Sequence, residues 1–122
     1  MICFLIDDDS DDRRIFKMAL NTLDSSIELI AASSGVDALE KFNSNDHFLP
    51  DYIFLDLNMP YMSGKECFTR LREIKRLKDV PIIIYSTVRA DYEGFGSSWA
   101  TSFITKPNSI SDIIKVLSGI IK

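Results

Sequence analysis

The sequence has few of the residues that mark several protein classes, and each shortage excludes one of those classes. It has only two cysteines, Cys3 and Cys67, which lie in apolar surroundings far apart in the chain. We therefore expect buried free thiols in a reducing compartment, and neither a disulfide framework nor a thiolate metal site. The single histidine, His47, stands in a polar stretch before Pro50 and is expected to be structural or exposed.

Positive charge and long apolar runs are also scarce. The chain has 14 Lys and Arg against 18 Asp and Glu, a net charge of -4. This balance argues against direct nucleic-acid binding, because a phosphate backbone requires a basic face. The longest apolar runs fall far short of the ~20 residues of a membrane span. Residues 1–6 are apolar but lack a basic flank, so we expect a cytoplasmic protein without a targeting segment or a membrane partner.

The composition that remains is typical of one soluble domain. The chain has 122 residues, of which 46% are hydrophobic and 26% charged, so we expect a single domain over residues 1–122. Apolar runs of strand length recur at residues 3–6, 27–31, 52–55, 82–85 and 102–105. Four of these five runs are continuous instead of alternating, which is typical of strands that are covered on both faces.

The segments between these runs carry apolar residues at helical spacing. Four stripes are clear: Ile15, Met18, Ala19 and Leu23; Val36, Leu39 and Phe42; Cys67, Leu71 and Ile74; and Ile110, Ile113, Ile114, Leu117, Ile120 and Ile121. Ser33 or Ser34 is expected to cap the second helix, and Asn108 or Ser109 the last. A helix within residues 90–100 has the least support, because two glycines there each disfavour a helix by about 1 kcal/mol.

The order of elements is a strand followed by a helix, five times over. Such alternation predicts an α/β fold with a parallel sheet, helices on both faces and right-handed crossovers. In these folds the ligand site lies at the carboxyl ends of the strands, near the point where the strand order reverses. The basic side of the third helix, between Arg70 and Arg76, is expected to be solvated.

Polar residues follow the strands where such a site is expected. They are Asp7-Asp8-Asp9, Asp56-Leu57-Asn58, Ser86-Thr87 and Thr105-Lys106-Pro107. Clustered carboxylates repel one another unless a cation lies among them, and oxygen ligands of this kind suit Mg²⁺. A carboxylate beside that ion can attack a phosphoryl group, while an ammonium and a hydroxyl bind the remaining phosphoryl oxygens.

With these motifs in place, the sequence resembles the receiver domain of two-component response regulators, the chemotaxis response regulator family. The resemblance extends from Phe4 to about Leu117. The matching positions are the acidic pair Asp7-Asp8, the phosphoacceptor Asp56 followed by Asn58, Pro60 and Gly64, the hydroxyl of Ser86, the aromatic Phe103, and the pair Lys106-Pro107, where a cis peptide bond is usual. Each motif alone is common, but the whole series at these spacings is specific.

The resemblance implies a flavodoxin-like (βα)5 fold with strand order 2-1-3-4-5 and phosphorylation on Asp56. The implied Mg²⁺ ligands are Asp8, Asp56 and the backbone carbonyl of Asn58, with Asp7 acting through water. Lys106 and Ser86 would assist the transfer. Phosphorylation would draw Ser86 toward the phosphoryl group and let Phe103 turn inward, although Phe103 as an ordinary core residue is an open alternative. The protein would not be an enzyme beyond its own phosphorylation and slow dephosphorylation.

The resemblance also implies partners. The phosphodonor would be a phosphohistidine on a sensor histidine kinase or a histidine phosphotransfer protein. The downstream partner would bind the face made by the fourth helix, the fifth strand and the last helix, and the chain would be a monomer or weak dimer. The segment between Ser86 and Lys106 is about two residues shorter than is usual, with Trp99 in place of a glycine. Val88 is expected to shield the phosphoryl group from hydrolytic water.

Alternatives stand beside these assignments. Asp9, Ser10, Asp11 and Asp12 are expected merely to cap the first helix. The run Asp7-Asp8-Asp9 also resembles the start of a haloacid-dehalogenase signature, whose nucleophile lies on the first strand, but the chain ends before the later acidic motifs of that family. A degenerate receiver that only binds partners is the third hypothesis. Mg²⁺-dependent binding of beryllofluoride at Asp56 would distinguish the three.

Overall fold

The structure is a computed structural model, and it describes residues 1–87 and 102–121. The strands are β1 (Ile2–Ile6), β2 (Glu28–Ala32), β3 (Tyr52–Leu55), β4 (Ile82–Ser86) and β5 (Ser102–Thr105). The helices are α1 (Ser10–Leu23), α2 (Gly35–Ser44), α3 (Gly64–Arg72), the 3-10 turn η1 (Lys75–Leu77) and α4 (Ile110–Ile120). The five strands lie within a residue or so of their expected positions.

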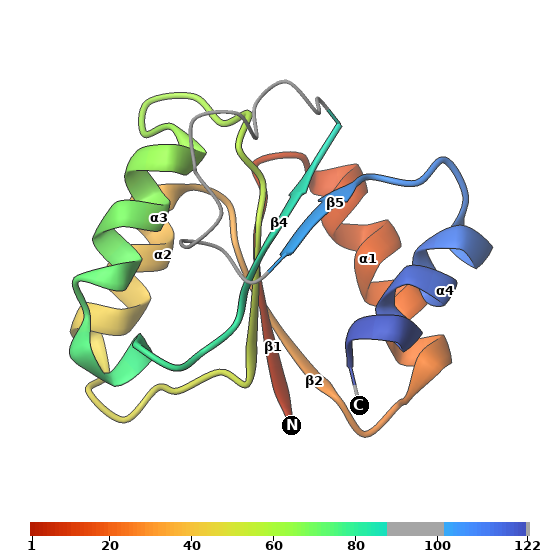
Figure 1. Ribbon diagram of the computed structural model, residues 1–122, viewed down its shortest axis with the longest axis horizontal. Coiled ribbons are helices and arrows are strands. Elements are labelled where there is room, and N and C mark those ends of the chain that lie inside the picture. The colour runs from red at the N-terminus through yellow and green to blue at the C-terminus, as the bar shows by residue number, and fades with distance from the viewer. Residues whose placement is uncertain (88–101, 122) are drawn as a thin grey trace.

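The strands form one parallel sheet in the order β2-β1-β3-β4-β5. Figure 1 shows α1 and α4 on one face of the sheet and α2 and α3 on the other. This arrangement confirms the α/β fold and the strand order 2-1-3-4-5. The order reverses between β1 and β3, whose last residues, Ile6 and Leu55, are partners in the register. The polar residues that follow these two strands therefore emerge side by side.

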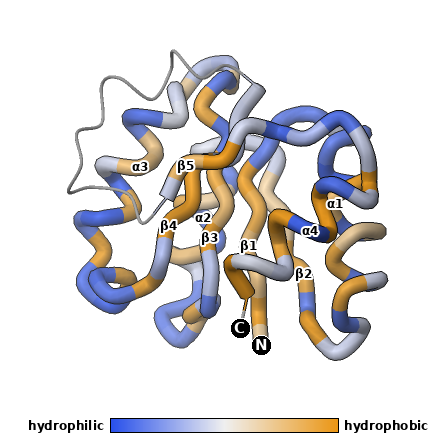
Figure 2. The backbone as a smooth tube through the Cα atoms, turned by 45° about the vertical axis from the view of Figure 1, so that its right-hand side comes forward, coloured by the Kyte–Doolittle hydropathy of each residue, from blue (hydrophilic) through white to orange (hydrophobic). Residues whose placement is uncertain are grey.

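Each face of the sheet has its own hydrophobic core, because successive side chains of a strand point to opposite faces. Phe4 packs under α2 and α3, where its ring meets Phe42 edge-on at 5.3 Å. The next side chain, Leu5, lies under α1 and α4 with Phe16, whose ring meets Tyr85 at 5.5 Å. Figure 2 shows hydrophobic residues along the central strands. The continuous apolar runs in the sequence reflect these two cores.

Side-chain oxygens cap the helices that enclose the sheet. Ser34 accepts a hydrogen bond from the backbone of Asp37 at 3.0 Å, and Ser109 accepts one from the backbone of Asp112 at 3.2 Å. Ser34 and Ser109, and neither of the alternative residues, are therefore the N-caps of α2 and α4. Such caps typically contribute about 1 kcal/mol each. Asp9 caps α1, as expected, by accepting from two backbone amides.

The expectation of a solvated basic side on the third helix is wrong for two arginines. Helix α3 ends at Arg72, whose guanidinium donates to the carbonyls of Leu77 and Val80 at 2.9 and 3.0 Å. Arg76, in η1, donates to Phe42, Asn45 and Phe48 carbonyls at 2.6 to 3.1 Å. A guanidinium has five N–H donors in a fixed plane, so it can donate hydrogen bonds to carbonyls at helix ends and in turns, which have no partner within a helix.

Three further points bear on the sequence-based expectations. Val88, the helix expected within residues 90–100, and Trp99 lie outside the described residues. In the described part of the chain no peptide bond is cis. The expected cis bond between Lys106 and Pro107 is therefore wrong, and the bond adopts the trans form that X–Pro bonds favour by about 0.5–1 kcal/mol. Among the described helices, none has both the length and the apolar character needed to cross a membrane.

Candidate functional site

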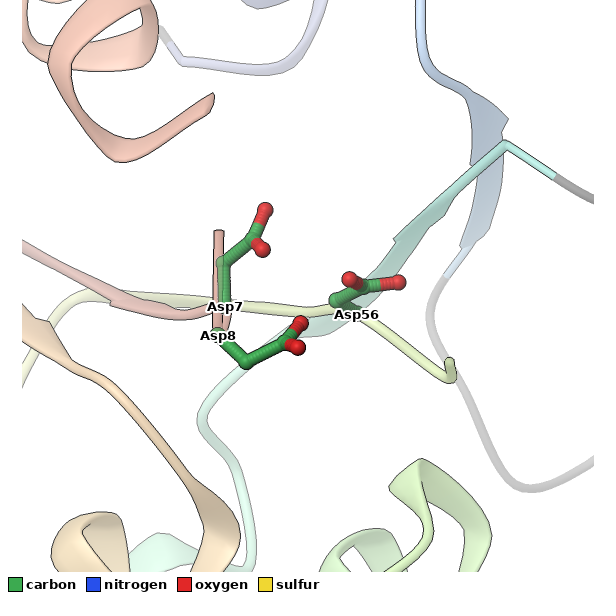
Figure 3. Close-up of side chains that lie close together, drawn as sticks. All are labelled: Asp7, Asp8 and Asp56. Carbon is green, nitrogen blue, oxygen red and sulfur yellow. The ribbon is translucent and has the colours of Figure 1, made fainter. Parts of the chain in front are cut away.

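Three carboxylates meet where β1 and β3 end. Asp7 and Asp8 follow β1 and Asp56 follows β3, and one oxygen from each lies within 4.8 Å of the others. In Figure 3 the three side chains lie side by side, and the Asp8 carboxylate points toward Asp56. The backbone amide of Asp7 donates to Ala32 and that of Asp56 donates to Ile6, at 3.1 and 2.9 Å. These bonds continue the sheet hydrogen bonding by one residue and so place the acids firmly.

A buried ammonium completes the cluster. The backbone of Lys106 donates to Ser86 at 2.9 Å, which brings the lysine alongside the end of β4. Its Nζ lies 2.7 Å from Asp7 Oδ2, 2.8 Å from Asp12 Oδ2 and 3.3 Å from Asp56 Oδ2. Burial alone would lower the pKa of Lys106, but hydrogen bonds to Asp12 and Asp7 outweigh it and raise the pKa. The lysine is therefore a fixed positive charge at neutral pH.

Burial lowers the pKa of a lysine but raises that of a carboxyl group, and Asp7, whose Oδ2 lies nearest to Lys106 Nζ, shows this second effect. The Asp7 side chain is fully buried. Burial raises the pKa of Asp7 to about 6, although Lys106 and the backbone amide of Asp9 oppose the rise. The charge of Asp56 adds to it. Like charges crowded at one point favour a cation among them, because a cation relieves both the repulsion and the burial cost.

The loop after β3 is held tightly against the start of α3. The backbone amide of Asn58 donates to Asp56 Oδ1 at 3.2 Å. Gly64 donates to the carbonyl of Leu57 at 3.1 Å, and a Cβ on Gly64 would lie 2.3 Å from Leu57 Cα and 2.7 Å from Asp56 O. Only glycine permits this approach. The glycine of the motif thus lets α3 begin in close contact with the backbone of Asp56 and Leu57.

Ser86 and Phe103 lie on the two strands nearest Lys106. Ser86 ends β4, is fully buried, and is the register partner of Thr105. Phe103 is the register partner of Ile84, is half-buried, and packs against the core under α2 and α3. Ser86 therefore lies at the same end of the sheet as the acids. Phe103 lies on β5 two residues before Thr105, the register partner of Ser86. Their roles as switch residues stay predictions.

Asp12 is a member of the cluster that the sequence analysis missed. It was expected only to cap α1, but the cap is Asp9, which accepts from Asp11 and Asp12 amides at 2.8 and 3.1 Å. The carboxylate of Asp12 instead binds Lys106 at 2.8 Å. The signal that could have identified Asp12 is its place in the first turn of α1, three residues after the cap. That turn begins at the same edge as the acids.

A family comparison decides what kind of domain carries this cluster. The sequence model of the response regulator receiver domain matches residues 3–118. The chain belongs to the response regulator receiver domain family. It is a CheY-like receiver domain of two-component signalling.

Named relatives agree with this assignment. The receiver is 32% identical over 123 residues to the sensor histidine kinase CheAY of Helicobacter pylori, covering 99% of this chain but 15% of that protein. It is 25% identical to the response regulator Rcp1 of a Synechocystis species, covering 98% of this chain and 85% of Rcp1. The chain therefore spans a small part of the first relative and most of the second.

Solved structures give the same answer for the fold. The phosphorylated cyanobacterial phytochrome response regulator RcpA superposes on the receiver with a TM-score of 0.84 at 26% identity, over 98% of this chain and 89% of that one. The Mn²⁺-bound form of Rcp1 superposes with a TM-score of 0.77 at 26% identity, over 98% and 90%. These structures share with this receiver the flavodoxin-like fold.

Proposed function

We propose that this receiver accepts a phosphoryl group on Asp56 in a Mg²⁺-dependent reaction. The observation that carries the proposal is the convergence of three carboxylates and one buried ammonium at the point where the strand order reverses. The fold alone would not support a particular reaction, because the same fold occurs in proteins of different function and the residues of the site determine the chemistry. Here the site offers a nucleophile, a set of hard oxygen ligands and a fixed positive charge.

The donor set fits a divalent cation. The three acids supply only oxygen atoms, within 4.8 Å of one another, and Mg²⁺ takes one or two carboxylates together with waters and phosphate oxygens. Asp8, Asp56 and the backbone carbonyl of Asn58 would hold the ion, with Asp7 acting through water. When bound, Mg²⁺ supplies positive charge that offsets the charge of the phosphoryl oxygens. The Mn²⁺-bound form of Rcp1 supports a divalent metal in a related receiver.

The transfer itself follows from the positions of the protein groups. A carboxylate oxygen of Asp56 attacks phosphorus, the bond from phosphorus to the donor nitrogen breaks, and its electron pair stays on the donor imidazole. The ammonium of Lys106, 3.3 Å from Asp56 Oδ2, and the Ser86 hydroxyl would bind phosphoryl oxygens. The transition state of phosphoryl transfer requires little covalent chemistry from the protein, so the positions and charges of the surrounding groups provide most of the rate enhancement.

The proposal extends to partners and output. The donor would be a phosphohistidine on a sensor histidine kinase or a histidine phosphotransfer protein. Residues 1–122 would act as one cytoplasmic domain, as a monomer or weak dimer, with no catalysis beyond its own phosphorylation and dephosphorylation. Movement of Ser86 and Phe103 would alter the face expected of the fourth helix, the fifth strand (β5) and the last helix (α4), where a downstream protein would bind. The expected fourth helix lies outside the described residues.

Acetyl phosphate, a small phosphodonor, tests the proposal directly. With Mg²⁺, the wild-type protein should gain the mass of one phosphoryl group, and Asp56→Asn should gain none. Asp79→Asn, which alters an exposed acid before the start of β4, at the opposite end of the sheet from the cluster, is the matched control and should behave as the wild type does. Mass spectrometry of peptides identifies the modified residue. A phosphoryl group on Asp7 or Asp9 would favour the dehalogenase-type alternative, and no adduct together with no beryllofluoride binding would favour a degenerate receiver.

A further inference from the structure

The ammonium of Lys106 already has as many partners as it has protons. It donates to Asp7, Asp12 and Asp56 at 2.7, 2.8 and 3.3 Å, and an ammonium has three donors and no acceptor. It also lies 5.6 Å from the centroid of the Tyr85 ring. A new acceptor, such as a phosphoryl oxygen on Asp56, can therefore be bound in full only if one present partner is released.

We propose that Asp12 is a positioning residue that holds Lys106 in competition with the phosphoryl group, and that Asp12 is the partner released when Asp56 is modified. This inference rests on the proposed function. It adds an inhibitory contact to the site, because the contact with Asp12 must be broken before Lys106 can bind the phosphoryl oxygen in full.

Exposure distinguishes Asp12 from the other two acids. Its side chain is 37% exposed, compared with 0% for Asp7 and 7% for Asp56. Asp12 and Lys106 also line a cavity of about 330 Å³, so water can reach the carboxylate once the lysine leaves. A carboxylate that can be hydrated costs far less to release than one that stays buried without its counter-ion.

The surroundings of Asp7 make its release costly. Asp7 Oδ1 accepts from the backbone amide of Asp9 at 3.0 Å, and its backbone carbonyl accepts from Arg13 at 2.7 Å. Asp7 is thus fixed on three sides, whereas no hydrogen bond to the Asp12 carboxylate other than that from Lys106 is found in the described part of the chain. Asp12 is therefore the partner that can be given up.

Charge adds to this competition. The Asp12 and Asp56 oxygens are at most about 6 Å apart, since both lie within reach of the same Nζ at 2.8 and 3.3 Å. At that distance two negative charges near a protein surface repel each other appreciably, and salt screens the repulsion only in part. Removal of the Asp12 charge should therefore favour an anionic group on Asp56 in two ways. The ammonium of Lys106 becomes available to that group, and the repulsion from the Asp12 carboxylate is lost.

Beryllofluoride affinity at saturating Mg²⁺ tests the inference. We expect Asp12→Asn to bind beryllofluoride about fivefold more tightly than the wild type. Asp12→Glu keeps the charge and should stay within about twofold of the wild type. Asp11→Asn is the matched control, because Asp11 lies in the same turn but pairs with exposed Arg14 at 3.7 Å. Unchanged or weaker binding by Asp12→Asn, with binding by the wild type intact, would overturn the role of Asp12 alone. A wild type that binds no beryllofluoride would overturn the proposed function as well.

A second measurement is independent of any phosphate analogue. The rate at which acetic anhydride modifies Lys106, read by peptide mass spectrometry, reports how firmly its ammonium is held. The rate should rise severalfold in Asp12→Asn and stay unchanged in Asp11→Asn. Equal rates in the two variants would show that Asp12 does not hold the lysine. Because Asp12 is partly exposed, both variants should fold, and thermal unfolding of each protein verifies this.

Discussion

Two buried ionisable side chains, the thiols of Cys3 and Cys67, take no part in the ion cluster. Both are fully buried. Burial raises the pKa of the Cys3 thiol to about 11, with a smaller contribution from Asp51, and raises that of Cys67 to about 12, with a smaller contribution from Glu66. A thiol held neutral in this way is a poor nucleophile. These cysteines are core residues, as the sequence indicated.

The raised pKa of Cys67 predicts how stability depends on pH. The neutral thiol is favoured in the folded protein. The free energy that this preference adds to stability is therefore fully present below the pKa of the thiol in the unfolded chain, near 9, and is lost as pH rises toward 12. The loss is up to about 1.4 kcal/mol per pH unit. Cys67→Ala should therefore be less stable than the wild type at neutral pH, by about 1 kcal/mol. That deficit should shrink above pH ~9.

Urea unfolding of both proteins between pH ~7 and ~10.5 measures this difference, because titration of other groups cancels between them. Denatured protein should react with a thiol reagent at pH ~8 while native protein does not. A stability difference that stays constant across this range would contradict the assignment.

At this scale the sequence predicted residue types better than residue partners. The acids of the cluster and Lys106 were expected at one edge because each follows a strand. Asp12 was assigned to capping, since nothing in a helical sequence tells which of several nearby acids will meet a lysine 94 positions later. Arg76 was assigned to solvent for the same reason. A side chain's partner depends on how the elements pack, which local periodicity does not encode.

Among the elements, η1 ties one side of the molecule together. Arg76 in this turn binds the carbonyl of Phe42, near the end of α2, at 2.6 Å, and the carbonyls of Asn45 and Phe48 beyond it. Its guanidinium also lies 5.5 Å from the centroid of the Phe42 ring. One side chain thus joins the connection after α3 to the connection after α2, on the face where these two helices cover the sheet (Figure 1).

Arg76→Lys should therefore lower the free energy of unfolding, although the substitution retains the positive charge. A lysine ammonium cannot reproduce the planar contacts of a guanidinium with three carbonyls, two of them in part-buried hydrogen bonds. The loss of such charged hydrogen bonds costs about 1.5–3 kcal/mol. Arg70→Lys is the matched control, because within the described residues the one ion pair found for Arg70 is an exposed pair with Glu66 at 3.7 Å. That change should cost less than about 0.5 kcal/mol. Denaturant unfolding compares the two, and equal losses would show that the Arg76 contacts are dispensable.

Element boundaries illustrate what local patterns encode. Strands β3 and β5 begin and end where their apolar runs do, because proline or polar residues flank each run. The third helix was extended as far as Ile74, but α3 stops at Arg72 and η1 follows. The apolar period continues through Ile74, which still packs on the core. The sequence therefore located the buried side chain correctly and its helical state incorrectly.

For the whole molecule, metal binding should couple to stability. Bringing three carboxylates together without a cation costs free energy, and a ligand that binds only the folded state returns it by mass action. At a Mg²⁺ concentration ten times the Kd, the gain is about 1.4 kcal/mol. This corresponds to a rise in Tm of roughly 5 °C for a domain of this size.

Asp8→Ala should abolish that rise. Asp8 is the exposed member of the three clustered acids, so its removal should leave the core intact. Asp11→Ala is the matched control and should respond to Mg²⁺ as the wild type does. Without Mg²⁺, Asp8→Ala should be at least as stable as the wild type, because one repelling charge is gone. A rise in Tm that persists in Asp8→Ala would place the ion elsewhere.

The ion cluster also has a consequence for the order in which the protein is made. Lys106 follows Asp7 by 99 positions and Asp56 by 50. At about 5–20 residues per second, Asp56, the last of the acids, is translated roughly 3–10 s before the lysine. A growing chain can pair β1 with β2 and β3 during that interval, but its acids then lack their ammonium. We therefore expect a nascent receiver to be unable to accept a phosphoryl group efficiently until Lys106 has been translated and has reached the acids.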